Sequence, residues 1–541
     1  MHKIFCFLFL ILIYSCGKSV DLLVHNAKIY TANETFDEAT SFVVKDGIFI
    51  EVGDEGLKNK YNAKNIVDAR GLSIIPGLID AHCHFLQYGL ESQQINLRGT
   101  KSFKEVIEKV KKYVFENNPK IVYGRYWDQN DWKSTDFPNK NELDKLFPDI
   151  PVILERVDGH AYLVNQKTLD ISGINIETRV DGGTVVIEDG KLTGILIDSP
   201  MNLVNKSLPP PSVEEKIKAL VLAEEKSFQY GLTTVDEAGL SKENILLIDS
   251  LQKLDILNMR IYAMISNNSD DVNYFLNNGI LKTDKLNVRS VKVYADGALG
   301  SRGAALIMPY TDMTNHKGKF ITSVKSMDSL AKVLVKSDFQ MNTHAIGDDA
   351  NRSVLDIYNN VLIDKEDPRW RIEHSQIISP EDFDKFNSKI IPSVQPTHAT
   401  SDMFWADERI GIDRLKNGGY AYKKLLDWSG TIALGTDFPV EEISPFHTFY
   451  AAVVRKNLNN LPFGGFQSEN SLSRYDALMG MTLWAAHSNF EENEKGSIEA
   501  GKMADFVILD RDIMKIEENQ IPLTKVVATI LGGNIVYSNR F

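Results

Sequence analysis

The stretch Pro76-Gly77-Leu78-Ile79-Asp80-Ala81-His82-Cys83-His84-Phe85 constrains the fold more than any other part of the chain. A mostly apolar run from Leu72 to Ile79 leads into it and predicts a buried strand. Side chains two residues apart on a strand share a face, so His82 and His84 would project together. Two such imidazoles form half of a metal site, and a pair of hydrogen-bonded core histidines is the alternative.

Composition narrows the class of protein. With 541 residues the chain is long enough for two to four domains, or for one barrel with insertions. The formal charge of −13 argues against a nucleic-acid partner and against a basic face that binds membranes.

The N-terminus has the pattern of a targeting segment. His2 and Lys3 precede an apolar run from Ile4 to Tyr14 that is too short to span a bilayer and fits a signal-peptide core. The run ends in a sequence that resembles a bacterial lipobox, which predicts removal of residues 1–15 and lipidation of Cys16. The protein would then be anchored by lipid in the bacterial cell envelope and face the periplasm. A plain secretory signal and a soluble periplasmic protein are the alternative. With Cys16 acylated no pair of cysteines remains, so no disulfide is predicted.

Both ends of the chain are rich in short strands. Alternating segments with turns fill the first part up to about Ala69, and similar segments follow the signature Gly501-Lys502-Met503-Ala504-Asp505. This predicts one small β-sandwich domain assembled from residues 16–75 and 491–541.

The long middle part, residues 76–490, alternates strands with amphipathic helices. This alternation is typical of a parallel barrel, so the predicted fold class is α/β, with a (β/α)8 TIM-like barrel beside the sandwich. Residues from about 121 to 206 fit the alternation poorly and predict an insertion over one face of the barrel.

Several predicted strands end in side chains that can bind a metal. In a barrel of this kind the reactive groups lie at the strand ends, so residues from distant parts of the sequence would meet there. Lys292 is notable because it lies within an otherwise apolar strand. The candidates in chain order are His82, His84, Lys292, His344, His374 and Asp437.

With these motifs the chain resembles the amidohydrolase superfamily, and within it amidohydrolase family 3, the branch of N-substituted formamide deformylase-like and YtcJ-like proteins. The resemblance implies one or two divalent ions, usually zinc. It implies that His82 and His84 bind the first ion and that His344 and His374 bind the second. Lys292, carboxylated by CO₂, would bridge a binuclear site, and Asp437 would bind the first ion and carry protons.

The function predicted from these residues is metal-dependent hydrolysis of a C–N bond in a small amide-like molecule, such as an N-acyl or N-formyl compound. The attacking group would be a hydroxide that the metal forms from water at neutral pH. A deaminase or cyclic-amide hydrolase on the same site is the first alternative. A lipoprotein that binds metal and ligand without catalysis is the second. A homodimer is one arrangement that the sequence leaves open.

Four further side chains are candidates for the substrate pocket. Three lie in the predicted insertion, and the fourth follows the segment Gln395-Pro396; they are Trp127, Asp128, His160 and His398. Packing or loop structure is an equally good explanation for each of them.

Overall fold

The computed structural model describes residues 18–539, except 135, 158, 160 and 181–182. Its residues form two compact units, one from the described residues up to Phe85 together with those from Glu224 onward, and the other from Leu86 to Ala223. The predicted signal segment, Cys16 and His160 lie outside the described residues. None of the helices within the described part of the chain is long and apolar enough to cross a membrane.

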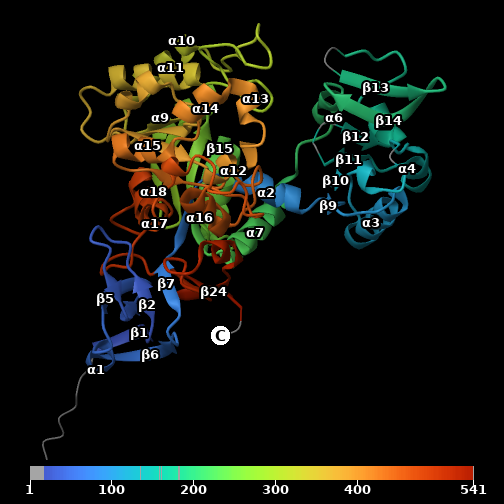
Figure 1. Ribbon diagram of the computed structural model, residues 1–541. Helices are drawn as coiled ribbons and strands as arrows, with labels where there is room; N and C mark the ends of the chain where they lie inside the picture. The colour runs from blue at the N-terminus through green and yellow to red at the C-terminus, as the bar shows by residue number, and fades with distance from the viewer. Residues whose placement is uncertain (1–17, 135, 158, 160, 181–182, 540–541) are drawn as a thin grey trace, which may run out of the picture. The chain divides into compact units, whose positions relative to one another are not determined.

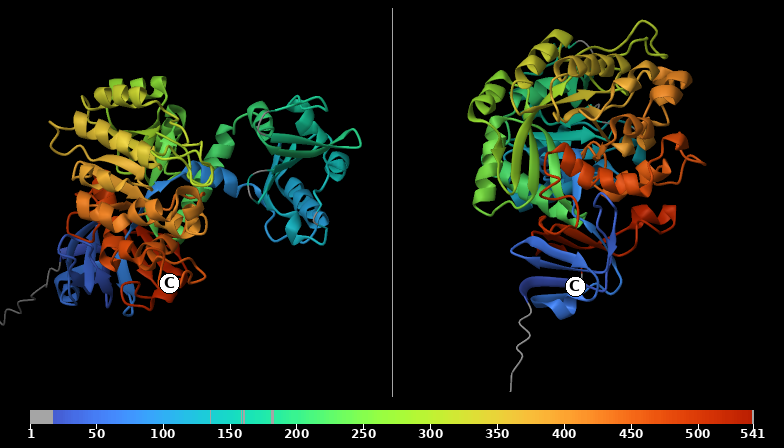
Figure 2. Two further views of the ribbon diagram at one scale, coloured as in Figure 1. Left: turned by 45° about the horizontal axis from the view of Figure 1, so that its top comes forward. Right: turned by 90° about the vertical axis from the view of Figure 1, so that its left-hand side faces the viewer.

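The two chain ends build one β-sandwich, as predicted. Its first sheet has the strand order β5 (Ile48–Gly53), β4 (Ser41–Lys45), β1 (Lys18–His25) and β6 (Tyr61–Asp68). The second has the order β25 (Asn534–Ser538), β24 (Val526–Leu531), β23 (Phe506–Leu509), β7 (Ser73–Pro76), β2 (Lys28–Tyr30) and β3 (Glu38–Ala39). Both views in Figure 2 show strands from the start of the chain beside strands from its end.

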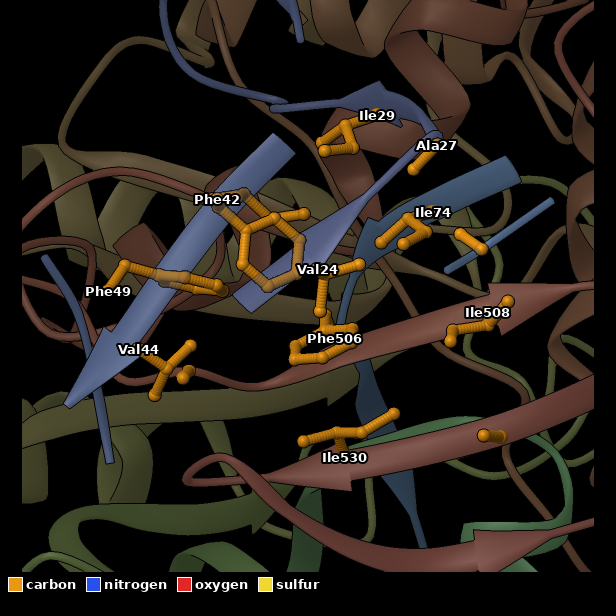
Figure 3. Close-up of a cluster of buried hydrophobic side chains, with 14 residues drawn as sticks. Val24, Ala27, Ile29, Phe42, Val44, Phe49, Ile74, Phe506, Ile508 and Ile530 are labelled. Carbon is orange, nitrogen blue, oxygen red and sulfur yellow. The ribbon is translucent and has the colours of Figure 1, made fainter. Parts of the chain in front are cut away.

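Aromatic and β-branched side chains fill the space between these sheets. Phe42 contacts the rings of Phe49 and Phe506 at centroid distances of 5.1 and 4.8 Å, and all three side chains are buried (Figure 3). Such edge-to-face packing adds to the gain from burying apolar area, which is about 1.5–3 kcal/mol for each large side chain. Residues from both ends of the chain therefore share one hydrophobic core.

The middle of the chain forms the predicted barrel of parallel strands. The strands in spatial order are β8 (Leu78–Cys83), β15 (Leu232–Leu240), β16 (Arg260–Ser266), β18 (Leu286–Tyr294), β19 (Gln340–Ala345), β20 (Trp370–His374), β21 (Ile390–Val394) and β22 (Ala433–Leu434). Backbone hydrogen bonds from Asp437 N to His82 O (2.8 Å) and from His84 N to Phe438 O (2.8 Å) join the last strand region to the first.

Helices surround this barrel (Figure 1). They are α8 (Lys242–Lys253), α9 (Ser269–Asn278), α10 (Val324–Leu334), α11 (Asp348–Val361), α12 (Pro396–Asp402), α13 (Ala406–Ile410), α14 (Ile412–Gly418), α15 (Tyr422–Ser429), α16 (Pro445–Val454), α17 (Arg474–Gly480) and α18 (Leu483–Ser488). A capping box formed by Ser473 and Asp476 starts α17. A break at residues 481–482 separates α17 from α18.

The strand predicted from Leu72 to Ile79 is in fact two strands. The chain passes from the sandwich strand β7 to the barrel strand β8 at Gly77, whose N–H donates to Asp505 O at 2.9 Å. Gly77 packs against Thr233 so closely that a Cβ atom would collide with the threonine side chain. An apolar run shows burial but not a change of sheet, which explains the error.

The second unit has its own sheet and helices. The strand order is β13 (Gly183–Glu188), β14 (Lys191–Asp198), β12 (Ala161–Val164), β11 (Val152–Arg156), β10 (Val122–Trp127) and β9 (Ile95–Asn96). Helices α3 (Phe103–Asn117), α4 (Asn141–Leu146), α5 (Gln166–Ile171) and α6 (Met201–Ser207) belong to it, with α2 (Phe85–Ser92) and α7 (Val213–Gln229) at its ends. This unit begins earlier in the chain and ends later than the insertion predicted from about residue 121 to 206.

The two ends of this unit meet each other. Gly89 of α2 lies against the backbone of Ala219 in α7, too close for any side chain at position 89. Gln93 Nε2 also donates to Glu215 O at 3.0 Å. The whole unit is inserted between β8 and β15, which pair directly with each other.

Candidate metal centre

The structure brings the six predicted ligands to one end of the barrel. His82, Lys292, His344 and His374 lie at or near the C-terminal ends of their strands β8, β18, β19 and β20. His84 and Asp437 follow the ends of β8 and β22. Because parallel strands of a barrel all end at one face, residues far apart in the sequence become neighbours there.

Three of these side chains form the tightest group. Ligand atoms of His82, His374 and Asp437, all buried, lie within 4.8 Å of one another. His84 Nε2 lies 3.2 Å from Asp437 Oδ1, and the ring of His344 lies 4.5 Å from that of His374. A cluster of imidazoles and one carboxylate is a donor set that suits zinc and related divalent ions.

Lys292 lies beside this group. Its side chain is buried, and its Nζ lies 3.1 Å from His82 Nε2. Burial lowers the pKa of Lys292 to about 8, although Glu373 and Asp437 favour its charged form. A larger fraction of the amine is therefore uncharged near neutral pH than for an exposed lysine, and the free amine is the form that reacts with CO₂.

Three of the predicted ligand histidines, His82, His344 and His374, are held neutral. Burial, and then the charge of Lys292, lower the pKa of His82 to about 4 and that of His344 to about 3. Burial likewise places the pKa of His374 well below its ordinary value. Neutral imidazole is the protonation state that binds a metal ion.

Buried polar atoms at this place lack partners. Within the described residues, His344 Nε2 and His374 Nδ1 make no hydrogen bond, and Asp437 Oδ1 makes no well-directed one. Buried polar atoms are nearly always paired, so unpaired ones at a functional site need an explanation. Two imidazole nitrogens and a carboxylate oxygen that lack hydrogen bonds among these residues fit a divalent cation.

Backbone conformation also indicates a functional site at His374 and Asp437. His374 and Asp437 have φ angles of 71° and 63°, in the left-handed region that residues other than glycine rarely adopt. Such strain persists where the surrounding structure fixes a functional side chain.

His398 lies against Asp437. Its Nε2 is 3.2 Å from Asp437 Oδ2, and its Nδ1 is 3.1 Å from Glu441 Oε1. Burial disfavours the imidazolium, but the hydrogen bonds to these two carboxylates outweigh burial and raise the pKa of His398 well above its ordinary value. Burial also disfavours the charged form of Asp437, yet hydrogen bonds from His398 and His84 keep the pKa of Asp437 well below its usual range. His398 thus holds one oxygen of Asp437, whereas its predicted role in the substrate pocket stays a prediction.

A buried chain of charges supports His82, and the sequence did not reveal it. Glu373 Oε2 accepts from His82 Nδ1 at 2.5 Å, and Arg371 Nε donates to Glu373 Oε1 at 2.8 Å. Arg371 Nη1 also donates to Asp236 Oδ2 at 2.7 Å. A carboxylate on the far nitrogen of a ligand histidine fixes its tautomer and orientation. The segment Arg371-Ile372-Glu373 contains a pattern that could have indicated it, because its two charged residues alternate with an apolar one along a buried strand.

The remaining candidates belong to the second unit. Trp127 is buried in the core of that unit, where its Nε1 donates to Leu154 O at 2.8 Å. Asp128 Oδ1 pairs with Arg156 at 2.9 Å. The structure thus gives Trp127 a packing role within its own unit, and the predicted substrate contacts of both residues stay predictions.

The chain is similar to known proteins over most of its length. Residues 65–537 match the model described as the amidohydrolase family. The protein LONG AFTER FAR-RED 3 of Arabidopsis thaliana is 32% identical over 96% of this chain and 92% of its own length. The N-substituted formamide deformylase of Arthrobacter pascens is 24% identical over 96% of this chain and 98% of its own length.

A solved structure shows the same fold. The crystal structure of an uncharacterised metal-dependent hydrolase from Pyrococcus horikoshii superposes with a TM-score of 0.79 at 25% sequence identity. The match covers 92% of this chain and 99% of that one.

Proposed function

The chain belongs to the amidohydrolase family of metal-dependent hydrolases, and we propose that it cleaves the C–N bond of a small amide-like molecule at the barrel end that carries His82 and Asp437. The observation that carries the proposal is that ligand atoms of His82, His374 and Asp437, all buried, lie within 4.8 Å of one another, in a group where His374 and Asp437 each have a polar atom without a hydrogen bond. The similarity to the N-substituted formamide deformylase supports an N-formyl or N-acyl compound as the substrate class.

The metal ligands follow from the geometry and the family resemblance together. His82, His84 and Asp437 would hold one ion, and His344 and His374 would hold a second. Lys292 lies beside His82 and would bridge the two ions once CO₂ has converted its amine to a carbamate. When bound, ions such as zinc make water a stronger acid and polarise a carbonyl group.

Asp437 is suited to move the proton that the reaction requires. Its Oδ2 is held by His398, whereas Oδ1 lies 3.8 Å from His82 Nε2 and is directed toward the ligand group. In the proposed reaction Oδ1 accepts a proton from the attacking water and returns it to the departing nitrogen. An amine leaves poorly as an anion, so this transfer is part of the C–N cleavage.

Direct assay tests the proposed function. Zinc-loaded protein is incubated with a panel of N-formyl and N-acetyl amines, beside cyclic amides and amino-substituted heterocycles, and released amine is measured. We expect release from at least one N-formyl or N-acetyl compound and its loss after chelation.

His374→Ala should lose metal and activity, because an incomplete ligand set binds zinc weakly. His316→Ala, outside the ligand group, is the matched control. Metal-loaded protein that releases ammonia only from the heterocycles would contradict the proposal.

We also propose that Cys16 carries a lipid that anchors the protein to the membrane on its periplasmic side. The basis is the sequence of the predicted leader, and more than one acyl chain is needed for stable anchoring. Cys16→Ser should therefore move the protein from the membrane fraction to the soluble periplasm. Cys6→Ser, a change within the predicted leader, should leave it in the membrane fraction. Wild-type protein that is already soluble after fractionation would refute the anchor.

A further inference from the structure

Tyr294 lies at the mouth of the barrel, directly beside the proposed metal ligands. It is the last residue of β18, two residues after Lys292, so the two side chains share the inward face of the strand. In the register of β18 with β19 its partner is His344. Tyr294 is thus one layer closer to solvent than Lys292.

The ring of Tyr294 is held in place by the ligand residues. Its centroid lies 5.4 Å from that of His344 and 5.0 Å from Lys292 Nζ. The side chain is nevertheless 39% exposed, which leaves part of it open to an incoming molecule. A residue placed in this way can touch both the metal group and a substrate.

The hydroxyl group of Tyr294 is not used by the fold. Its Oη makes no hydrogen bond to any residue within the described ranges, whereas Glu373 and His398 beside the ligand group are paired. A phenol hydroxyl keeps its proton at neutral pH and can donate one hydrogen bond.

We propose that Tyr294 is a catalytic residue that donates a hydrogen bond from Oη to the oxygen of the substrate's scissile carbonyl group. The proposal rests on the proposed amide hydrolysis. When water adds to the amide carbon, the carbonyl π electrons move to that oxygen, which becomes negative. When the C–N bond breaks, that electron pair re-forms the C=O bond, and the C–N bonding pair leaves with the nitrogen, which takes the proton held by Asp437. The new carboxylic acid then releases its own proton to become a carboxylate. A fixed donor at that oxygen stabilises the transition state more than the substrate, because the charge develops only there.

The test compares Tyr294→Phe with the wild type. The phenylalanine keeps the ring against His344 and removes only the hydroxyl. We expect kcat to fall by about 10²-fold, the typical cost of one lost oxyanion donor, with little change in KM. Metal content should stay unchanged. Tyr274→Phe, which removes a hydroxyl of similar exposure (37%) on the outer helix α9, is the matched control.

A binding measurement makes the test independent of turnover. Methylphosphonate has tetrahedral oxygens like those of a hydrated acetyl group, and calorimetry can measure its affinity for zinc-loaded protein. Tyr294→Phe should bind it at least about tenfold more weakly than the wild type or Tyr274→Phe.

The possible outcomes separate this inference from the proposed function. If wild type hydrolyses amides and Tyr294→Phe matches it in kcat and in methylphosphonate affinity, the role of Tyr294 is refuted and the function stands. If Tyr294→Phe loses metal, the side chain supports the ligands and the donor role is also refuted. If wild type hydrolyses no amide but binds methylphosphonate more tightly than Tyr294→Phe, the donor role stands and the proposed function fails.

Discussion

Lys292→Ala is expected to lower kcat/KM for the best amide substrate by more than about 10³-fold, because a lost metal ligand should cost more than the 10- to 100-fold typical of a residue behind a ligand. The physical reason is the position of the side chain. An ammonium group buried beside His82 would repel the proposed ions, and its desolvation would cost several kcal/mol, which Glu373 and Asp437 offset only in part. As a carbamate, the same side chain offers two anionic oxygens. Without it, binding of at least one ion should weaken.

Three measurements check this expectation. Metal analysis should show fewer ions per chain in Lys292→Ala, whereas Lys332→Ala, on the outer helix α10, should match the wild type. Adding a short carboxylic acid to Lys292→Ala should partly restore metal and activity, because its oxygens replace those of the carbamate. In the wild type, intact mass under gentle conditions should show the mass of one added CO₂. An unmodified Lys292 in a fully active protein with a single ion would refute the bridge.

Asp437→Asn is expected to reduce kcat by about 10²–10⁴-fold, the usual contribution of general acid–base catalysis. The amide of asparagine is close in size but can neither accept a proton from water nor return it to nitrogen. His398 should lose part of its anchor as well, since its Nε2 faces Asp437 Oδ2 at 3.2 Å. Asp407→Asn, an exposed change on α13, serves as the control.

The choice of leaving group makes this test specific. If Asp437 protonates the departing nitrogen, the variant should lose most activity on amides of basic alkylamines. It should lose less on activated anilides, whose nitrogen leaves with less need of a proton. A loss of less than about tenfold on both classes would assign the proton transfer to another group.

Much of the candidate site could be predicted from the sequence because the proposed ligands lie at, near or just after the ends of strands. His82, Lys292, His344 and His374 each lie in a short segment predicted to be a strand, and the barrel brings the ends of such segments together. The ends of the chain also carried clear strand patterns, so the composite sandwich was predicted correctly. Periodicity and strand-end chemistry are local properties, and a single sequence contains them.

Other features depend on contacts that a sequence does not contain. Glu373 reaches His82 across the barrel, and the positive charge of Arg371 keeps the pKa of that carboxyl far below its ordinary value despite burial. The switch of sheets at Gly77 depends on Thr233, which is distant in the sequence. The hydroxyl of Tyr294 became a candidate only when the structure showed it beside His344 without a partner. Long-range packing decides each of these.

The insertion of the second unit has an evolutionary consequence. β8 and β15 pair directly, so the barrel needs nothing from the chain between them except a connection. Because α2 and α7 meet where the unit begins and ends, that connection can be short. The unit can therefore behave as a cassette that recombination exchanges for the corresponding segment of a relative. The residues proposed to bind metal and move protons all lie outside this unit, so chimeric descendants would keep every one of them.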